Sequence, residues 1–198
     1  MRVNIHFDMP RLAVFASGNG SNAQRIAEYF SGHPSVSVCL VLSNKPDAFV
    51  LERAVKLGIP TMVFNRDSFY ETGQVLETLR SYRIDYLVLA GFLWLIPQKI
   101  ISAFPGKILN IHPALLPGFG GKGMYGMKVH QAVIDSGEHE SGITIHYVDE
   151  NYDEGRIIFQ AKCPVSEDDT AESLAEKVHE LEYRWFAEVI EGVVGRDG

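Results

Sequence analysis

The chain has 198 residues, of which 46% are hydrophobic, and its formal charge is −7 at pH 7. This length and apolar content suffice for one substantial core, so we expect a single domain over residues 1–198, with residues 1–10 as an N-terminal extension. No run of Lys or Arg supplies the basic stripe that binds nucleic acid, so we expect no nucleic-acid partner.

Signals for membranes, secretion and metals are also missing. The longest apolar stretch, residues 86–96, is interrupted by a glycine and is too short to span a bilayer. Residues 1–10 lack the apolar centre of a signal peptide. Cys39 and Cys163 form no paired motif, which favours a reducing compartment. We therefore expect a cytoplasmic protein that contacts no membrane and holds no metal.

The first half of the chain alternates apolar runs with amphipathic segments. Strands are predicted at residues 11–16, 36–42, 61–64 and 85–90. Three helices are predicted between these strands. The first has Ala23, Ile26 and Phe30 on one face, the second covers residues 48–57, and the third has Phe69, Leu76 and Leu79 on one face. Strands that alternate with helices and are apolar on both faces predict a parallel sheet covered on both sides, a doubly wound α/β fold.

The second half follows a different pattern. A strand at residues 108–111 leads into a Pro/Gly-rich loop, residues 113–126, and a helix that ends at Gly137. Residues 143–148 and 157–165 alternate or run apolar and are predicted to pair as antiparallel strands. A long amphipathic helix closes the chain, with Asp169 or Thr170 as its cap.

Residues 18–22, Gly-Asn-Gly-Ser-Asn, lie between a predicted strand and a predicted helix. The N-terminus of a helix presents unpaired N–H groups and partial positive charge, and glycines allow an anion to approach the backbone. The segment is therefore either a phosphate cradle or an ordinary strand-to-helix turn. It does not complete the G-x-G-x-x-G pattern of a dinucleotide site.

Asn110 and His112 are two residues apart on a predicted strand, so their side chains point the same way. In an open parallel sheet, ligands bind beyond the carboxyl ends of the strands, where this strand ends. An amide donor beside an imidazole suits a carbonyl oxygen that becomes negative during attack. The acidic loop at residues 149–155 offers a carboxylate to orient His112, but spacing alone does not choose which one, and a solvated hairpin is the alternative.

Together these motifs resemble the folate-dependent formyltransferases, and more narrowly the branch that formylates phosphoribosylglycinamide in purine biosynthesis. The resemblance runs from about residue 11 to about residue 189. It rests on residues 18–22, 90–92 and 110–117 and on Asp153 before Gly155, in the family's order and near its spacing.

The resemblance implies a role for each matching residue. Asn110, His112 and Asp153 match the catalytic triad. Gly20, Ser21 and Asn22 match the phosphate cradle, and Glu182 matches the carboxylate that holds the sugar hydroxyls. Residues matching the folate pocket are Arg66, near the folate tail, and Phe92, Leu93, Trp94, Leu95 and Ile96, along its wall.

The resemblance also implies the reaction. An amine attacks the formyl carbon of 10-formyltetrahydrofolate, the co-substrate, directly and without a metal. Asn110 and protonated His112 stabilise the oxyanion while Asp153 assists proton transfer. The expected partners are small molecules, and the expected assembly is a monomer or homodimer.

The sequence departs from familiar members of the family at three places. Glu154 follows the catalytic Asp where glycine is usual, Trp94 stands where Arg is familiar, and the loop at residues 118–126 is longer and richer in glycine. We expect this loop to act as a mobile flap over the site.

The six other histidines carry weaker expectations. His146 is predicted to be structural, or to stand behind the site. His130, near the glycine-rich loop, could approach the phosphate. His6, His33, His139 and His179 are expected at the surface.

Rival functions fit the sequence less well. A methionyl-tRNA formyltransferase needs a further domain and a basic face, and hydrolases and sugar-nucleotide formyltransferases of the family have longer chains. A nicotinamide dehydrogenase needs an acidic residue after the second strand, where Ser43 and Asn44 stand instead. A non-catalytic anion-binding protein would leave Asn110, His112 and Asp153 without a purpose.

Overall fold

The computed structural model describes residues 9–196, which form one seven-stranded sheet in the order β3-β2-β1-β4-β5-β6-β7. The strands are β1 (Arg11–Phe15), β2 (Ser37–Ser43), β3 (Thr61–Val63), β4 (Tyr86–Leu89), β5 (Ile108–His112), β6 (Glu140–Tyr147) and β7 (Ile157–Pro164). Strands β1 to β5 pair in parallel, whereas β5–β6 and β6–β7 are antiparallel. The predicted mostly parallel sheet with an antiparallel C-terminal portion is confirmed.

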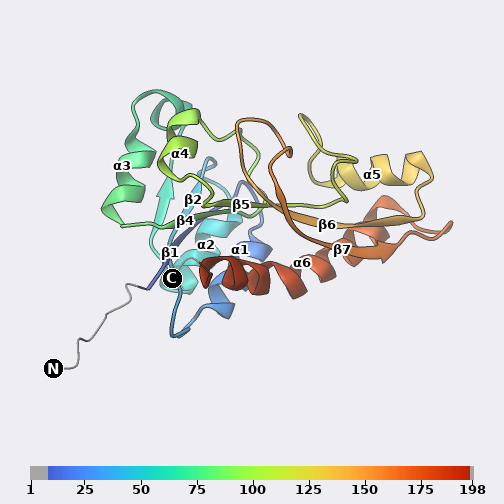
Figure 1. The fold of residues 1–198 in the computed structure, drawn as a ribbon, viewed down its shortest axis with the longest axis horizontal. Coiled ribbons are helices and arrows are strands. Elements are labelled where there is room, and N and C mark those ends of the chain that lie inside the picture. Colours follow the sequence, from blue (N-terminus) through green and yellow to red (C-terminus); the bar gives the residue numbers. More distant parts are fainter. Residues whose placement is uncertain (1–8, 197–198) are drawn as a thin grey trace.

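Helices cover both faces of this sheet (Figure 1). They are α1 (Ser21–Tyr29), α2 (Phe49–Lys56), the π-helical turn η1 (Asp67–Glu71), α3 (Gln74–Ser81), α4 (Gln98–Ala103), α5 (Met127–Ser136) and α6 (Ala171–Val194). Leu12 and Val14 of β1 pack into the core cluster that includes α1, α2, α5 and α6. Ala13 and Phe15 pack into the cluster that includes η1, α3 and α4. Because side chains alternate along a strand, both faces of the sheet are buried.

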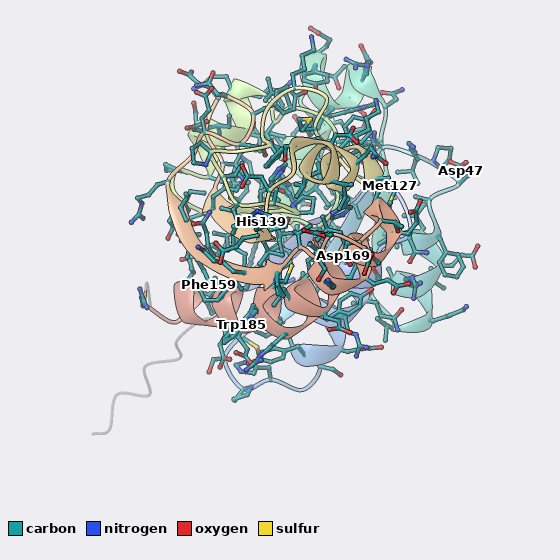
Figure 2. The ribbon with its side chains drawn as sticks, turned by 90° about the vertical axis from the view of Figure 1, so that its right-hand side faces the viewer. Asp47, Met127, His139, Phe159, Asp169 and Trp185 are labelled. Atoms are coloured by element: carbon teal, nitrogen blue, oxygen red, sulfur yellow. The ribbon has the colours of Figure 1, made fainter. Side chains whose placement is uncertain are left out.

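Helix α6 runs for 24 residues across one face of the sheet. Thr170 caps it, since its side chain accepts a hydrogen bond from the Ser173 N–H and the Ser173 hydroxyl bonds back to the Thr170 N–H. Trp185 of α6 lies against Phe159 of β7, with ring centroids 5.0 Å apart (Figure 2). The predicted amphipathic helix therefore packs against both the parallel and the antiparallel parts of the sheet.

Two helical segments differ from the sequence-based expectation. The helix expected to carry Phe69, Leu76 and Leu79 is divided into η1 and α3, because Gly73 between them adopts a φ of 79° that no right-handed helix contains. Helix α4, which follows Pro97, was not predicted. Within residues 9–196, no helix is both long enough and apolar enough to cross a bilayer.

The strand order reverses at β1, so the connections that leave β1 and β4 turn to opposite faces of the sheet. Such a switch point leaves a crevice at the carboxyl ends of the strands. Ser17 joins the two sides of the crevice: its N–H donates to the Gly91 carbonyl at 3.0 Å, and its hydroxyl oxygen accepts the Leu93 N–H at 3.1 Å. The fold therefore fixes the loops on which the predicted motifs lie.

Gly20 and Gly18 provide a matched test of how tightly the first loop is built. Gly20 has a φ of 75°, and a Cβ there would lie 2.3 Å from Val50 Cγ2, whereas a Cβ on Gly18 would meet open space. We expect Gly20→Ala to lower the free energy of unfolding by about 2 kcal/mol or more, because left-handed backbone and a clash both oppose the methyl group. Gly18→Ala should change it by less than about 0.5 kcal/mol. Denaturant unfolding measures both, and equal effects would contradict this account.

Candidate active site

A cavity of about 590 Å³ lies at the crevice. Its lining comes from residues 18–22, 89–96, 110–113, 121–126 and 151–153, together with His130, His146, Val148, His179 and Glu182. The structure thus brings together all but one of the site residues predicted from the sequence. The exception is Arg66, which does not line the cavity.

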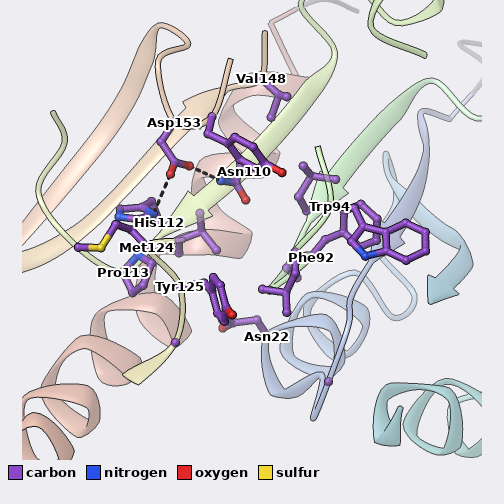
Figure 3. Close-up of a pocket in the computed structure, with 18 of the residues that line it drawn as sticks. Asn22, Phe92, Trp94, Asn110, His112, Pro113, Met124, Tyr125, Val148 and Asp153 are labelled. Carbon is purple, nitrogen blue, oxygen red and sulfur yellow. Dashed lines mark hydrogen bonds and ion pairs between the residues drawn. The ribbon is translucent and has the colours of Figure 1, made fainter. Parts of the chain in front are cut away.

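The carboxylate of Asp153 lies at the centre of the polar groups in this cavity (Figure 3). Its Oδ2 accepts the Gly121 N–H at 3.0 Å and lies 3.5 Å from His112 Nδ1. Its Oδ1 accepts a hydrogen bond from Asn110 Nδ2 at 3.4 Å and lies 3.6 Å from His146 Nε2. One carboxylate therefore contacts β5, β6 and the glycine-rich loop.

Asp153 is the one carboxylate of the acidic loop, residues 149–155, that lines the cavity. Asp149 Oδ1 accepts the Asn151 N–H at 2.9 Å within the loop, and Glu154 is exposed. Asp153 has a φ of 58°, and a Cβ on Gly155 would lie 1.7 Å from the Tyr147 carbonyl oxygen. The close backbone approach at Gly155 thus helps to turn Asp153 inward, and Glu154 points elsewhere.

His146 orients the amide of Asn110. The two residues are cross-strand neighbours on β5 and β6. His146 Nδ1 lies 2.8 Å from the Tyr147 carbonyl, which can only accept, so Nδ1 carries the proton. In the neutral ring Nε2 then accepts from Asn110 Nδ2 at 3.0 Å. This bond uses one of the two amide protons of Asn110 and fixes the direction of the other.

His112 is buried, and both of its ring nitrogens face protein groups. Nε2 lies 2.8 Å from the Phe119 carbonyl, which fixes a proton on Nε2, and Nδ1 faces Asp153. Burial lowers the pKa of His112 below its ordinary value, while the charge of Asp153 and the bond to Phe119 oppose that shift. The ring is therefore neutral near pH 7 and holds an unprotonated Nδ1 beside a carboxylate.

Asp153 itself stays ionised. Burial raises the pKa of this carboxyl, but interactions with His146 and His112 in their charged forms, and the hydrogen bond from the Gly121 N–H, hold the pKa below its ordinary value. A permanent negative charge thus faces the unprotonated side of His112. Any step that places negative charge in the cavity raises the proton affinity of that imidazole further.

The opposite end of the cavity is built around the start of α1. Gly20 is its N-cap residue, and the unpaired N–H groups of the first turn leave a site with partial positive charge. Asn22 Nδ2 donates to Glu182 Oε2 at 2.8 Å, and His179 Nε2 lies 3.9 Å from the same oxygen. Burial raises the pKa of Glu182, and the bond from Asn22 and the charge of His179 oppose the rise.

Aromatic side chains form the wall beside Phe92. The rings of Phe92 and Trp94 pack with those of Phe64, Phe69 and Tyr70. The Tyr70 hydroxyl donates to the Leu95 carbonyl at 2.8 Å. The guanidinium of Arg66 lies 4.9 Å from the centroid of the Trp94 ring, so Arg66 contacts the wall without lining the cavity.

Several lining residues were not predicted as parts of the site. His146 lines the cavity as well as being hydrogen-bonded, and its register opposite Asn110 was the available signal. His179 is exposed as expected but lines the cavity, and His130 is buried beside it. The long glycine-rich loop contributes Lys122, Met124 and Tyr125, which the sequence left without assigned contacts.

The remaining histidines lie away from the cavity. His139 is exposed, whereas His33 is largely buried and lies 3.2 Å from Glu191. His6 lies outside the described residues. No group of three or more His, Cys, Asp or Glu side chains in the described part of the chain could hold a metal ion.

Known proteins share both the sequence and the fold of this chain. The family model described as formyl transferase matches residues 10–190. The phosphoribosylglycinamide formyltransferase of Bacillus subtilis is 38% identical over 192 residues, which are 94% of this chain and 96% of that protein. The chloroplastic phosphoribosylglycinamide formyltransferase of Arabidopsis thaliana is 46% identical over 186 residues and 91% of this chain. The match spans 64% of the length of that plant protein.

A solved structure agrees with this assignment. Glycinamide ribonucleotide transformylase 1 from Symbiobacterium toebii superposes with a TM-score of 0.87 at 33% identity, covering 99% of this chain and 93% of that one. The predicted resemblance is thereby confirmed in sequence and in fold. The chain belongs to the formyl transferase family.

Proposed function

We propose that this chain transfers a formyl group from 10-formyltetrahydrofolate to the amine of phosphoribosylglycinamide. One observation carries the proposal. The same cavity holds Asn110, His112 and Asp153 at one end and an anion-binding helix start beside Glu182 at the other. A substrate with a reacting amine and a distant phosphate matches that arrangement, and the names of the relatives support it.

The amine substrate fits the end of the cavity near α1. The backbone at Gly20, Ser21 and Asn22 would hold the phosphate, because helix N-termini bind anions without a basic patch. The carboxylate of Glu182 would accept hydrogen bonds from the sugar hydroxyls. Among the cavity-lining residues that the structure describes, Lys122 is the one lysine or arginine, so the helix start supplies much of the attraction for phosphate.

The formyl donor fits the aromatic side of the cavity. The wall at Phe92, Leu93, Trp94, Leu95 and Ile96 offers apolar side chains and backbone hydrogen-bonding groups to a flat heterocycle. Arg66 would act at the outer face of Trp94, where the acidic tail of a folate emerges. In this chain Trp94, which packs against the guanidinium of Arg66, stands where an arginine is familiar in the family.

The chain's residues supply charge stabilisation. The amide proton of Asn110 that is directed at Asp153 Oδ1, over a long 3.4 Å contact, turns to the formyl oxygen as that oxygen becomes negative under attack by the neutral amine. His112 takes a second proton from solvent on Nδ1 before the attack, and the resulting imidazolium stabilises that charge electrostatically. His146 keeps the amide of Asn110 in the donating orientation throughout.

Asp153 assists the two proton transfers of the reaction. The attacking amine must lose a proton after it bonds to the formyl carbon, and the folate nitrogen must gain one as it leaves. An ionised Asp153, 3.5 Å from His112, favours the imidazolium by opposite charge and assists the transfer through water. The step needs no metal.

The decisive experiment offers the protein 10-formyltetrahydrofolate with phosphoribosylglycinamide, an aminosugar nucleotide, methionyl-tRNA, or water alone. Folate absorbance and mass spectrometry of the formylated product report each reaction. We expect transfer only to phosphoribosylglycinamide. Faster release of formate in water, or preference for another amine, would sink the proposal.

Removing either charge-stabilising group should abolish most turnover without unfolding the protein. We expect Asn110→Ala and His112→Ala each to lower kcat by about a hundredfold to a thousandfold, since each removes a donor or a positive charge at the developing oxyanion. His139→Ala, at an exposed position outside the cavity, is the matched control and should be unaffected. Near-normal kcat in either site variant would remove that residue from the mechanism.

Asp153→Asn tests the charge of Asp153 separately from its position. Asparagine tolerates the left-handed backbone at residue 153, so the loop should be retained. The charge of Asp153 raises the pKa of His112, so the variant should have a lower His112 pKa and a much lower kcat.

If protonated His112 is required, one limb of the pH–rate profile titrates with His112 and the other with the substrate amine. The limb that titrates with His112 should move to lower pH in Asp153→Asn, while the limb set by the substrate amine stays in place. A His112 limb at the same pH in both proteins would contradict the pairing of Asp153 with His112.

A further inference from the structure

His130 is a buried polar residue in the cavity to which the proposed mechanism gives no role. It is the fourth residue of α5, its exposed fraction is 2%, and it lines the cavity. Its Nδ1 is sealed from solvent and has no hydrogen-bond partner within residues 9–196. Buried polar groups without partners are uncommon in folded proteins, and each calls for an explanation.

The surroundings of His130 keep its ring neutral. Burial lowers the pKa of His130 to about 4, and the nearby His179 and His112 act in the same direction. A sealed N–H without an acceptor is costly, so the proton of the neutral ring resides on Nε2. His130 is therefore an uncharged hydrogen-bond donor beside the cavity.

His130 lines the same cavity as His112 and His179. His112 lies at the catalytic end, and His179 lies beside Glu182 at the end that would hold the sugar. A substrate that spans the cavity is therefore within reach of the wall to which His130 belongs.

We propose that His130 binds the uncharged amide that links the reacting amine to the sugar, donating from Nε2 to the amide carbonyl. The inference rests on the proposed function and names a specificity-determining residue for it. A neutral donor matches a neutral acceptor, whereas the phosphate has the start of α1.

The test uses two variants of His130 and two forms of the amine substrate. His130→Leu removes the donor at similar size, and His130→Gln keeps an N–H at a similar reach. Each is assayed with phosphoribosylglycinamide and with ribosylglycinamide that lacks the phosphate. A neutral hydrogen bond corresponds to a change of about three- to tenfold in affinity.

We expect His130→Leu to raise KM for the amine substrate by about that factor, with kcat and the folate KM unchanged. His130→Gln should recover most of the affinity, and the loss should be equal for both substrate forms. A loss that vanishes without the phosphate would show that His130 contacts the phosphate and would overturn the proposal. An equal rise in the folate KM, or no change in KM, would overturn it as well.

Calorimetric titration of phosphoribosylglycinamide without folate separates this inference from the proposed function. If the wild-type protein does not bind that compound, the proposed function fails. If wild type and His130→Leu bind it equally well, only the role of His130 fails.

Acid unfolding provides the structural control. The unfolded chain binds a proton at an ordinary histidine pKa of 6.5, whereas the folded protein resists protonation of His130 until about pH 4. Stability associated with this group is therefore lost as pH falls between those values. His130→Leu removes the loss, so its acid midpoint should lie at lower pH than that of wild type. An unchanged or higher midpoint would show that the ring is not held neutral in the fold.

Discussion

The carboxylate of Asp153 connects parts of the chain that are far apart in sequence, and the proposed catalytic end of the cavity depends on it. Its oxygens contact side chains from β5 and β6 and the backbone of the glycine-rich loop. A buried negative charge is stable only where donors surround it, and here the donors are the Asn110 amide and the Gly121 N–H. The same contacts therefore position the groups around Asp153 and keep its carboxylate ionised.

Hydrophobic periodicity predicted most of the fold. Alternation of strands and helices sufficed for the parallel half, because buried parallel strands read as continuous apolar runs. The division at Gly73 was not predicted, because a single glycine in the sequence does not indicate which φ it adopts. The short helix α4 was not predicted, because six residues carry too little hydrophobic periodicity.

The candidate site was predictable where chemistry coincided with an element boundary. Asn110 and His112 end a strand, and Gly20 begins a helix, so topology alone brings them to one edge of the sheet. Resemblance to a family was needed to choose Asp153 among the carboxylates of its loop. The contacts of His146 and His130 could not be predicted, because they depend on packing against other elements, which local sequence does not encode.

The charge of the cavity explains how an acidic protein can attract anions. Asp153 and Glu182 both line it, but each carboxylate is compensated by donors, and Asn22 donates to Glu182. Backbone dipoles at α1 then act against a modest opposing field. Selectivity for a phosphorylated substrate can thus coexist with a net charge of −7, because short-range N–H groups outweigh screened distant charges.

The glycine-rich loop is fastened to the site by its backbone. Phe119 receives the bond from His112, and Gly121 gives its N–H to Asp153, so the loop and the reactive side chains share their contacts. If the loop withdraws to let product leave, His112 loses an acceptor and Asp153 loses a donor in the same movement. Release of product and loss of the geometry of the proposed catalytic groups would then occur in one movement. Water that enters the open crevice would meet an imidazole and a carboxylate that are no longer positioned for acyl transfer.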